Sequence, residues 1–118
     1  MVMSEAQFDY SLTRQSDTSI IKVNELRLDR SKTPVFKTEL LRLIASGSKK
    51  ILVNLEKVNS IDSSGLGALT FGKRQLDEIG GEISVCCLQE KVLSLFRIAA
   101  LDRVFPIFDT VEDALKSE

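Results

Sequence analysis

Apolar residues along the chain fall into short runs and into longer segments of helical spacing. From Phe8 to Thr13 apolar and polar residues alternate, and an apolar run follows at residues 20–23. This pattern predicts an antiparallel hairpin whose first strand has one face towards water. Continuous apolar runs predict two buried strands of a parallel sheet at residues 51–55 and 83–88, and a last short strand at residues 106–109.

Four further segments have the spacing of amphipathic helices. They are predicted at residues 34–46, 63–79 and 111–116, and from residue 89 or 90 to residues 101–103. Thr33, Asp62 and Thr110 are the expected N-terminal caps, because their side-chain oxygens can accept hydrogen bonds from the unpaired N–H groups of a first turn. The inner face of the second helix is expected to hold Leu66, Leu69, Leu76 and Ile79. Residues 24–32 are polar apart from Leu26 and Leu28, and they predict the end of the second strand and a loop.

The predicted order of elements is β, β, α, β, α, β, α, β, α. Right-handed crossovers place the strands of successive strand-helix units side by side and parallel. We therefore predict an α/β fold with a mixed, mostly parallel sheet, an N-terminal hairpin and helices packed against the sheet. With 118 residues the chain has the size of one domain, expected over residues 1–118 with a core at residues 8–115.

The segment from Asp62 to Gly67 follows a predicted buried strand and begins the second helix. With Asp62 as the cap, Ser63 lies in the first turn, where the helix dipole and free N–H groups favour a negative charge such as a phosphate. Gly65 and Gly67 each cost about 1 kcal/mol relative to alanine inside a helix. Two glycines in one turn indicate either that another molecule approaches the backbone closely or that the helix packs tightly on the sheet.

Composition and charge exclude several classes of function. The chain carries 16 basic and 17 acidic residues, and its formal charge of −1 gives no electrostatic footprint for nucleic acid or an anionic membrane. No run reaches the roughly 18 apolar residues of a membrane-spanning helix, and residues 1–7 lack a signal-peptide pattern, so we expect a cytoplasmic protein. The sequence has no histidine, which excludes Ser-His-Asp and Cys-His catalysis and histidine-rich zinc sites.

Metal, nucleotide and redox sites are not predicted either. Cys86 and Cys87 are neighbours in an apolar run, where strand alternation directs side chains to opposite faces, and we expect both to be reduced core residues. The glycines at Gly65 and Gly67 lack the further glycine and the Lys-Ser/Thr pair of a phosphate-binding loop. An aspartyl-phosphate receiver needs clustered Mg²⁺-binding acids after its first strand, and Tyr10–Arg14 has none. We expect no cofactor and no enzymatic activity.

Three features together resemble a known family. They are the apolar strand leading into Ile-Asp-Ser-Ser-Gly-Leu-Gly at residues 61–67, the order of elements, and Arg-Leu-Asp at residues 27–29, five residues before Pro34. The chain resembles STAS domains, and most of all the small stand-alone anti-sigma factor antagonists of bacteria. The resemblance covers nearly the whole chain. It departs from the family at Leu26, where glycine is usual.

The resemblance implies a phosphorylation site and a protein partner. In that family the serine after the aspartate is phosphorylated by a serine kinase that is also the anti-sigma factor, which places the role on Ser63. Asp29 matches an acidic residue in a loop near the kinase's nucleotide. The expected partner-binding residues are Asp29, Asp62, Ser64, Gly65, Leu66 and Gly67. The implied partners are a GHKL-type serine kinase, which supplies the ATP, and a phosphatase. The chain itself is expected to be a monomer or weak dimer.

Partner switching is the mechanism that the resemblance implies. The unmodified chain binds the kinase and displaces a sigma factor, and phosphorylation of Ser63 adds roughly −1.5 to −2 charges, which releases it. The alternative is a constitutive scaffold of the same fold, a subunit of a signalling or lipid-transport assembly. In that case Ser63 only caps the helix and is never modified.

Overall fold

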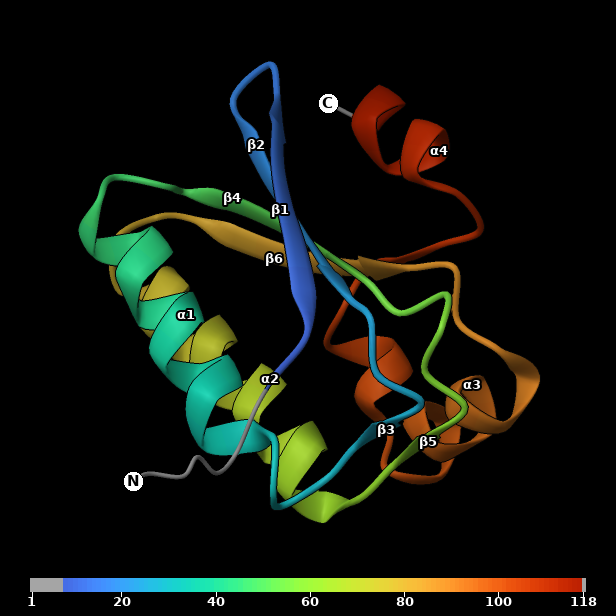
Figure 1. The fold of residues 1–118 in the computed structure, drawn as a ribbon. Helices are drawn as coiled ribbons and strands as arrows, with labels where there is room; N and C mark the ends of the chain where they lie inside the picture. The colour runs from blue at the N-terminus through green and yellow to red at the C-terminus, as the bar shows by residue number, and fades with distance from the viewer. Residues whose placement is uncertain (1–7, 118) are drawn as a thin grey trace, which may run out of the picture.

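Five strands form the main sheet of the computed structural model, which describes residues 8–117 (Figure 1). Their order is β1-β2-β4-β6-β7. The strands are β1 Tyr10–Gln15, β2 Thr18–Val23, β4 Lys50–Asn54, β6 Glu82–Cys86 and β7 Ile107–Phe108. β1 and β2 form an antiparallel hairpin, and β2, β4, β6 and β7 are parallel to one another. The predicted mixed sheet with an N-terminal hairpin is confirmed.

Helices cover both faces of the sheet. They are α1 Thr33–Ala45, α2 Ser63–Asp77, α3 Glu90–Ile98 and α4 Val111–Lys116, with a short 3₁₀ helix, η1, at Leu101–Arg103. Figure 1 shows α1 and α2 packed side by side on one face, with α4 on the opposite face. The larger core lies under α1–α3 and includes Ile21, Val53 and Val85, whereas Ala114 of α4 packs on Leu52 and the neighbouring residues of the other face.

A second, two-stranded sheet lies outside the main one. β3 (Arg27–Leu28) pairs in parallel with β5 (Ser60–Ile61), a pairing that the sequence did not predict. Backbone bonds extend the pairing on both sides: the N–H of Asn59 donates to the Leu26 carbonyl at 2.8 Å, and that of Asp62 donates to the Leu28 carbonyl at 3.3 Å. Strands of two residues are too short to leave a periodic pattern, so this pairing escaped prediction.

Several local predictions need correction. Thr33 is the buried first residue of α1 and does not cap it; Lys32 holds the cap position, and the carbonyl of Asp29 accepts the N–H groups of both. Leu12 is exposed, on β1, which is an edge strand of the sheet. The predicted strand at residues 83–88 ends at Cys86.

The inner face of α2 also differs from the prediction. Its buried residues are Gly65, Ala68, Leu69, Gly72 and Leu76. Leu66 is only half-buried, and Ile79 lies beyond the end of the helix and is exposed. Two glycines and an alanine therefore hold much of the inner face, which lets the helix backbone lie close to α1 and to the β3–β5 pair.

Candidate functional site

Asp62 caps α2 directly after β5. Its backbone is extended (φ −103°, ψ −175°), as is usual for a capping residue. One carboxylate oxygen, Oδ1, accepts hydrogen bonds from the N–H of Gly65 at 3.1 Å and from the hydroxyl of Ser64 at 2.6 Å. The predicted cap is confirmed, and it places Ser63 as the first residue of the helix.

The second carboxylate oxygen of Asp62 joins the helix to a distant loop. Oδ2 accepts a hydrogen bond from the backbone N–H of Arg30 at 3.2 Å. The pKa of Asp62 is lowered from its ordinary value, chiefly because the Ser64 hydroxyl donates to the ionised carboxylate; the N–H groups of Gly65 and Arg30 add to this, and desolvation opposes it. Asp62 is therefore a carboxylate whose ionised form is stabilised by contacts on both sides.

The two neighbouring serines lie in different environments. Ser64 is half-buried, and its hydroxyl donates to the capping carboxylate of Asp62. The same hydroxyl oxygen accepts a hydrogen bond from the hydroxyl of Thr33 at 3.5 Å. Ser63 is exposed, and within residues 8–117 no group forms a hydrogen bond with its hydroxyl. Ser63 thus presents an unengaged hydroxyl at the electropositive end of α2.

Asp29 lies in the turn that leads into α1. Its carboxylate accepts hydrogen bonds from the Ser31 N–H at 3.1 Å and the Ser31 hydroxyl at 2.7 Å. Its carbonyl accepts the N–H groups of Lys32 and Thr33. Since Arg30 bonds to Asp62, the structure brings this turn beside the start of α2. No residue type in the sequence predicts this contact, because its donor is a backbone N–H.

Gly65 and Gly67 have opposite surroundings. A Cβ on Gly65 would lie 2.6 Å from Cγ1 of Ile61 and 2.6 Å from the carbonyl oxygen of Leu28, so Gly65 permits tight packing of α2 on the β3–β5 pair. A Cβ on Gly67 would meet nothing within 4 Å, and this residue is exposed. Leu66, between them, is half-buried against the core. Tight internal packing therefore accounts for Gly65 and leaves Gly67 unexplained.

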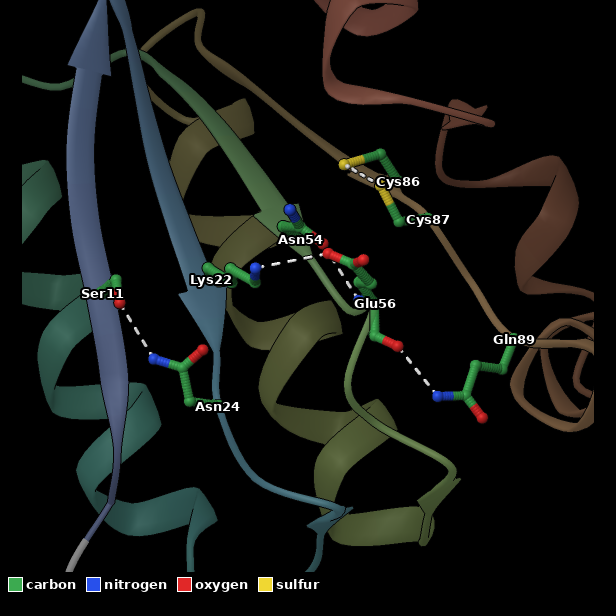
Figure 2. Close-up of polar contacts among 8 residues, drawn as sticks. All are labelled: Ser11, Lys22, Asn24, Asn54, Glu56, Cys86, Cys87 and Gln89. Atoms are coloured by element: carbon green, nitrogen blue, oxygen red, sulfur yellow. Dashed lines mark hydrogen bonds and ion pairs between the residues drawn. The ribbon is translucent and has the colours of Figure 1, made fainter.

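A polar network holds the loop between β4 and β5, from which the site follows (Figure 2). Oδ1 of Asn54, at the buried end of β4, accepts the N–H of Glu56 at 2.9 Å. The carbonyl of Glu56 accepts a hydrogen bond from Nε2 of Gln89 at 2.8 Å, and its carboxylate pairs with Nζ of Lys22 at 3.3 Å. These contacts join the loop to β2, β4 and the start of α3, so β5 and Asp62 begin from a fixed position.

Other kinds of site find little support in the described part of the chain. Among residues 8–117, no three Cys, Asp or Glu side chains lie together as metal ligands would. Within the same residues, every helix is too short or too polar to cross a bilayer. What the start of α2 offers chemically is a free hydroxyl beside an ionised carboxylate, on an exposed surface.

Comparisons with known proteins place the fold in a family. The sequence-family model of the STAS domain matches residues 9–114 of this chain. A Thermotoga neapolitana relative, named as a candidate anti-sigma factor antagonist homologous to TM1081, is 36% identical over 70 residues, which cover 59% of this chain and 62% of the relative. The anti-sigma F factor antagonist of Paenibacillus polymyxa is 32% identical over 65 residues, which cover 55% of this chain and 56% of the relative. Both matches span less than two thirds of the relative's length.

The likeness in structure extends further along the chain. The crystal structure of TM1081 from Thermotoga maritima, described there as a candidate anti-sigma factor antagonist, is 28% identical in sequence. The match covers 92% of each chain with a TM-score of 0.82. The element order and sheet described above are therefore those of that fold.

Proposed function

Because the chain belongs to the STAS domain family, we propose that it is an anti-sigma factor antagonist whose binding to its partner is switched by phosphorylation of Ser63. The observation that carries the proposal is the exposed, unengaged hydroxyl of Ser63 at the first position of α2. The names of the relatives support the general role. The neighbouring Ser64 is a poor candidate for the same modification, since its hydroxyl already donates to Asp62.

The proposed partner is a GHKL-type serine kinase that is also the anti-sigma factor. The kinase supplies the ATP, and a phosphatase resets the serine. The docking surface comprises Ser63, Leu66 and Gly67 of α2 with the turn at Asp29. Gly65 supports this surface from inside, because it allows α2 to pack on β5. We further propose that residues 1–118 act as one domain, in the cytoplasm, as a monomer or weak dimer.

Charge is the proposed switch. A phosphate on Ser63 adds roughly −1.5 to −2 charges at neutral pH. The helix terminus attracts this charge, whereas the ionised Asp62 next to it repels it. A partner surface that fits a neutral hydroxyl must desolvate the phosphate to bind it. A difference of about 1 to 3 kcal/mol in binding free energy changes affinity some 5- to 150-fold.

The first experiment tests the modification. The purified chain is incubated with ATP and the GHKL-type kinases encoded in the same genome, and its mass is measured intact and after digestion. We expect one phosphate, confined to Ser63, which is lost in Ser63→Ala and kept in the matched variant Ser64→Ala. If no kinase modifies the chain while a control antagonist is modified in parallel, the switch is wrong and the constitutive scaffold takes its place.

The second experiment tests the charge. The affinity of the kinase for the wild type, Ser63→Ala and Ser63→Asp is measured by calorimetry. We expect Ser63→Ala to bind like the wild type and Ser63→Asp to bind at least 5-fold more weakly, in line with the coupling energies of such switches. Equal binding of the two variants would refute the charge mechanism even if Ser63 is phosphorylated.

A further inference from the structure

Two thiols lie in contact at the end of β6, on the face of the sheet that α4 covers. Sγ of Cys86 and Sγ of Cys87 are 3.5 Å apart, and a dashed line in Figure 2 marks their contact. Cys86 is the last residue of β6 and is fully buried, whereas Cys87 lies outside the strand and is half-buried. The proposed role of Ser63 makes no use of either thiol.

The backbone at Cys87 explains how adjacent residues bring their sulfurs together. In a continuous strand, neighbouring side chains point to opposite faces, which was the basis for the sequence prediction. Cys87 instead has φ +64°, in the left-handed region. As a result, both side chains pack against the same cluster, which contains Ile20, Leu52 and Ala114. The prediction of sulfurs on opposite faces is wrong.

The left-handed conformation is costly for a cysteine. A residue with a Cβ loses about 1–2 kcal/mol there, and glycine or asparagine is the usual choice. Such strain persists only where surrounding contacts hold it, and it is common at functional sites. At Cys87 the backbone N–H donates to the Phe108 carbonyl at 3.0 Å, which fixes this residue against β7.

We propose that Cys86 and Cys87 form a reversible thiol–disulfide site that is closed by hydroperoxides. The thiolate sulfur of Cys87 attacks the peroxide oxygen, breaks the O–O bond and becomes a sulfenic acid, while the second oxygen leaves as water or an alcohol. The sulfur of Cys86 then attacks the Cys87 sulfur and forms the S–S bond; the S–O bond breaks, and the Cys86 proton leaves with the displaced hydroxyl as water. Two thiols are oxidised and one peroxide is reduced.

The surroundings assign the order of the two steps. Burial raises the pKa of the Cys86 thiol, and the contact with Cys87 raises it further, so Cys86 stays neutral and is slow to react with peroxide. Cys87 is half-buried and is the more exposed of the two cysteines. Its fixed position beside Cys86 favours closure of the pair over further oxidation, because the resolving thiol is already in contact.

The closed form is expected to reopen easily. The sulfurs must approach from 3.5 Å to about 2.05 Å, and the resulting ring contains only the two cysteines and the peptide bond between them. Strained disulfides are more readily reduced than structural ones and are often regulatory. The site lies on the opposite side of the sheet from α2 and does not depend on the modification of Ser63.

Intact mass spectrometry of the 118-residue chain tests the proposal. After treatment with hydrogen peroxide, we expect a monomer lighter by two hydrogen atoms that does not react with N-ethylmaleimide even in denaturant, where the buried Cys86 is exposed. Reduced glutathione should restore two alkylations per chain under the same denaturing conditions. A product that instead gains oxygen atoms, a disulfide-linked dimer as the main species, or no reaction of the thiols would overturn the proposal.

Two single variants test the assigned order. In Cys86→Ala, Cys87 should stop at the sulfenic acid, which dimedone traps, because the resolving thiol is gone. In Cys87→Ala, the remaining buried thiol should be oxidised at least 10-fold more slowly than the wild type. Equal oxidation rates in the wild type and Cys87→Ala would overturn the order. Both readouts are independent of binding to a kinase, so their failure leaves the proposal for Ser63 intact.

Discussion

Alanine substitutions at the two glycines in the first turns of α2, Gly65 and Gly67, should change the free energy of unfolding differently. Alanine in place of glycine in a helix gains up to about 1 kcal/mol, mainly from the lower entropy of the unfolded chain. At Gly67 nothing opposes this gain, because the new Cβ has open space around it. At Gly65 the new Cβ lies 2.6 Å from the Leu28 carbonyl oxygen, and a backbone atom cannot move aside cheaply.

The expected magnitudes follow from these surroundings. Overpacking costs about 1–3 kcal/mol, which offsets or exceeds the helical gain at Gly65. We therefore expect the free energy of unfolding of Gly67→Ala to be about 0.5–1 kcal/mol above that of the wild type. The free energy of unfolding of Gly65→Ala should equal the wild-type value or lie below it, about 1–3 kcal/mol below that of Gly67→Ala.

Urea unfolding followed by far-ultraviolet circular dichroism measures the difference. With a denaturant slope of about 2 kcal/mol per molar for a domain of this size, the midpoints of the two variants should differ by about 0.5–1.5 M. The comparison is matched, since both substitutions add one methyl group to the same helix. Equal midpoints of the two variants, or a midpoint lower for Gly67→Ala than for Gly65→Ala, would show that the close packing of α2 on β3 and β5 does not require glycine at residue 65.

Further predictions concern the cap, the two serines and a buried hydroxyl pair. The pKa of Asp62 is lower in the folded chain than its ordinary value of 3.8. The ionised carboxylate therefore stabilises the fold at pH values above 3.8, and this contribution is lost as the pH falls through the folded pKa. In urea titrations, the difference in unfolding free energy between wild type and Asp62→Asn should shrink as the pH is lowered from about 6 to about 3. Ser64→Ala should lower the unfolding free energy by about 1 kcal/mol, because a bond to the cap is lost, whereas Ser63→Ala should stay within about 0.5 kcal/mol of the wild type; equal melting temperatures of the two variants would contradict this. The buried hydroxyls of Ser19 and Ser48 are 2.7 Å apart. Each single alanine variant should therefore lower the free energy of unfolding by about 1–3 kcal/mol, and the double variant should lower it by less than the sum of the two. Additive losses in a double-mutant cycle would mean that the pair is not coupled.

Much of the architecture was predictable from local patterns. The hairpin, the buried strands β4 and β6 and all four helices follow from periodicity and capping residues, because these elements are long enough to repeat a pattern. The pairing of β3 with β5 was not, since each strand has two residues and joins segments about thirty residues apart. The role of Thr33 was misassigned because a threonine before a proline fits both the cap and the first helical position.

The candidate site was predictable only in part, for the same physical reason. The cap at Asp62 and the position of Ser63 depend on residues close in sequence, and capping rules predict them. The bond from Arg30 to Asp62 depends on the β3–β5 pair, so it requires the tertiary structure. The sequence left two interpretations for the glycines, and the structure assigns internal packing to Gly65 alone.

The geometry around Ser63 limits how a phosphate there could act. The side chain is exposed, and among residues 8–117 no side-chain donor bonds to its hydroxyl, while Asp62 already occupies the N–H of Gly65. A phosphate on Ser63 would therefore face solvent, where the attraction of the helix terminus is opposed by the ionised carboxylate of Asp62. Its charge would act mainly on whatever molecule docks at this end of α2. For this reason the proposed switch requires no refolding of the domain, and Ser63→Asp is expected to change partner affinity far more than it changes the free energy of unfolding.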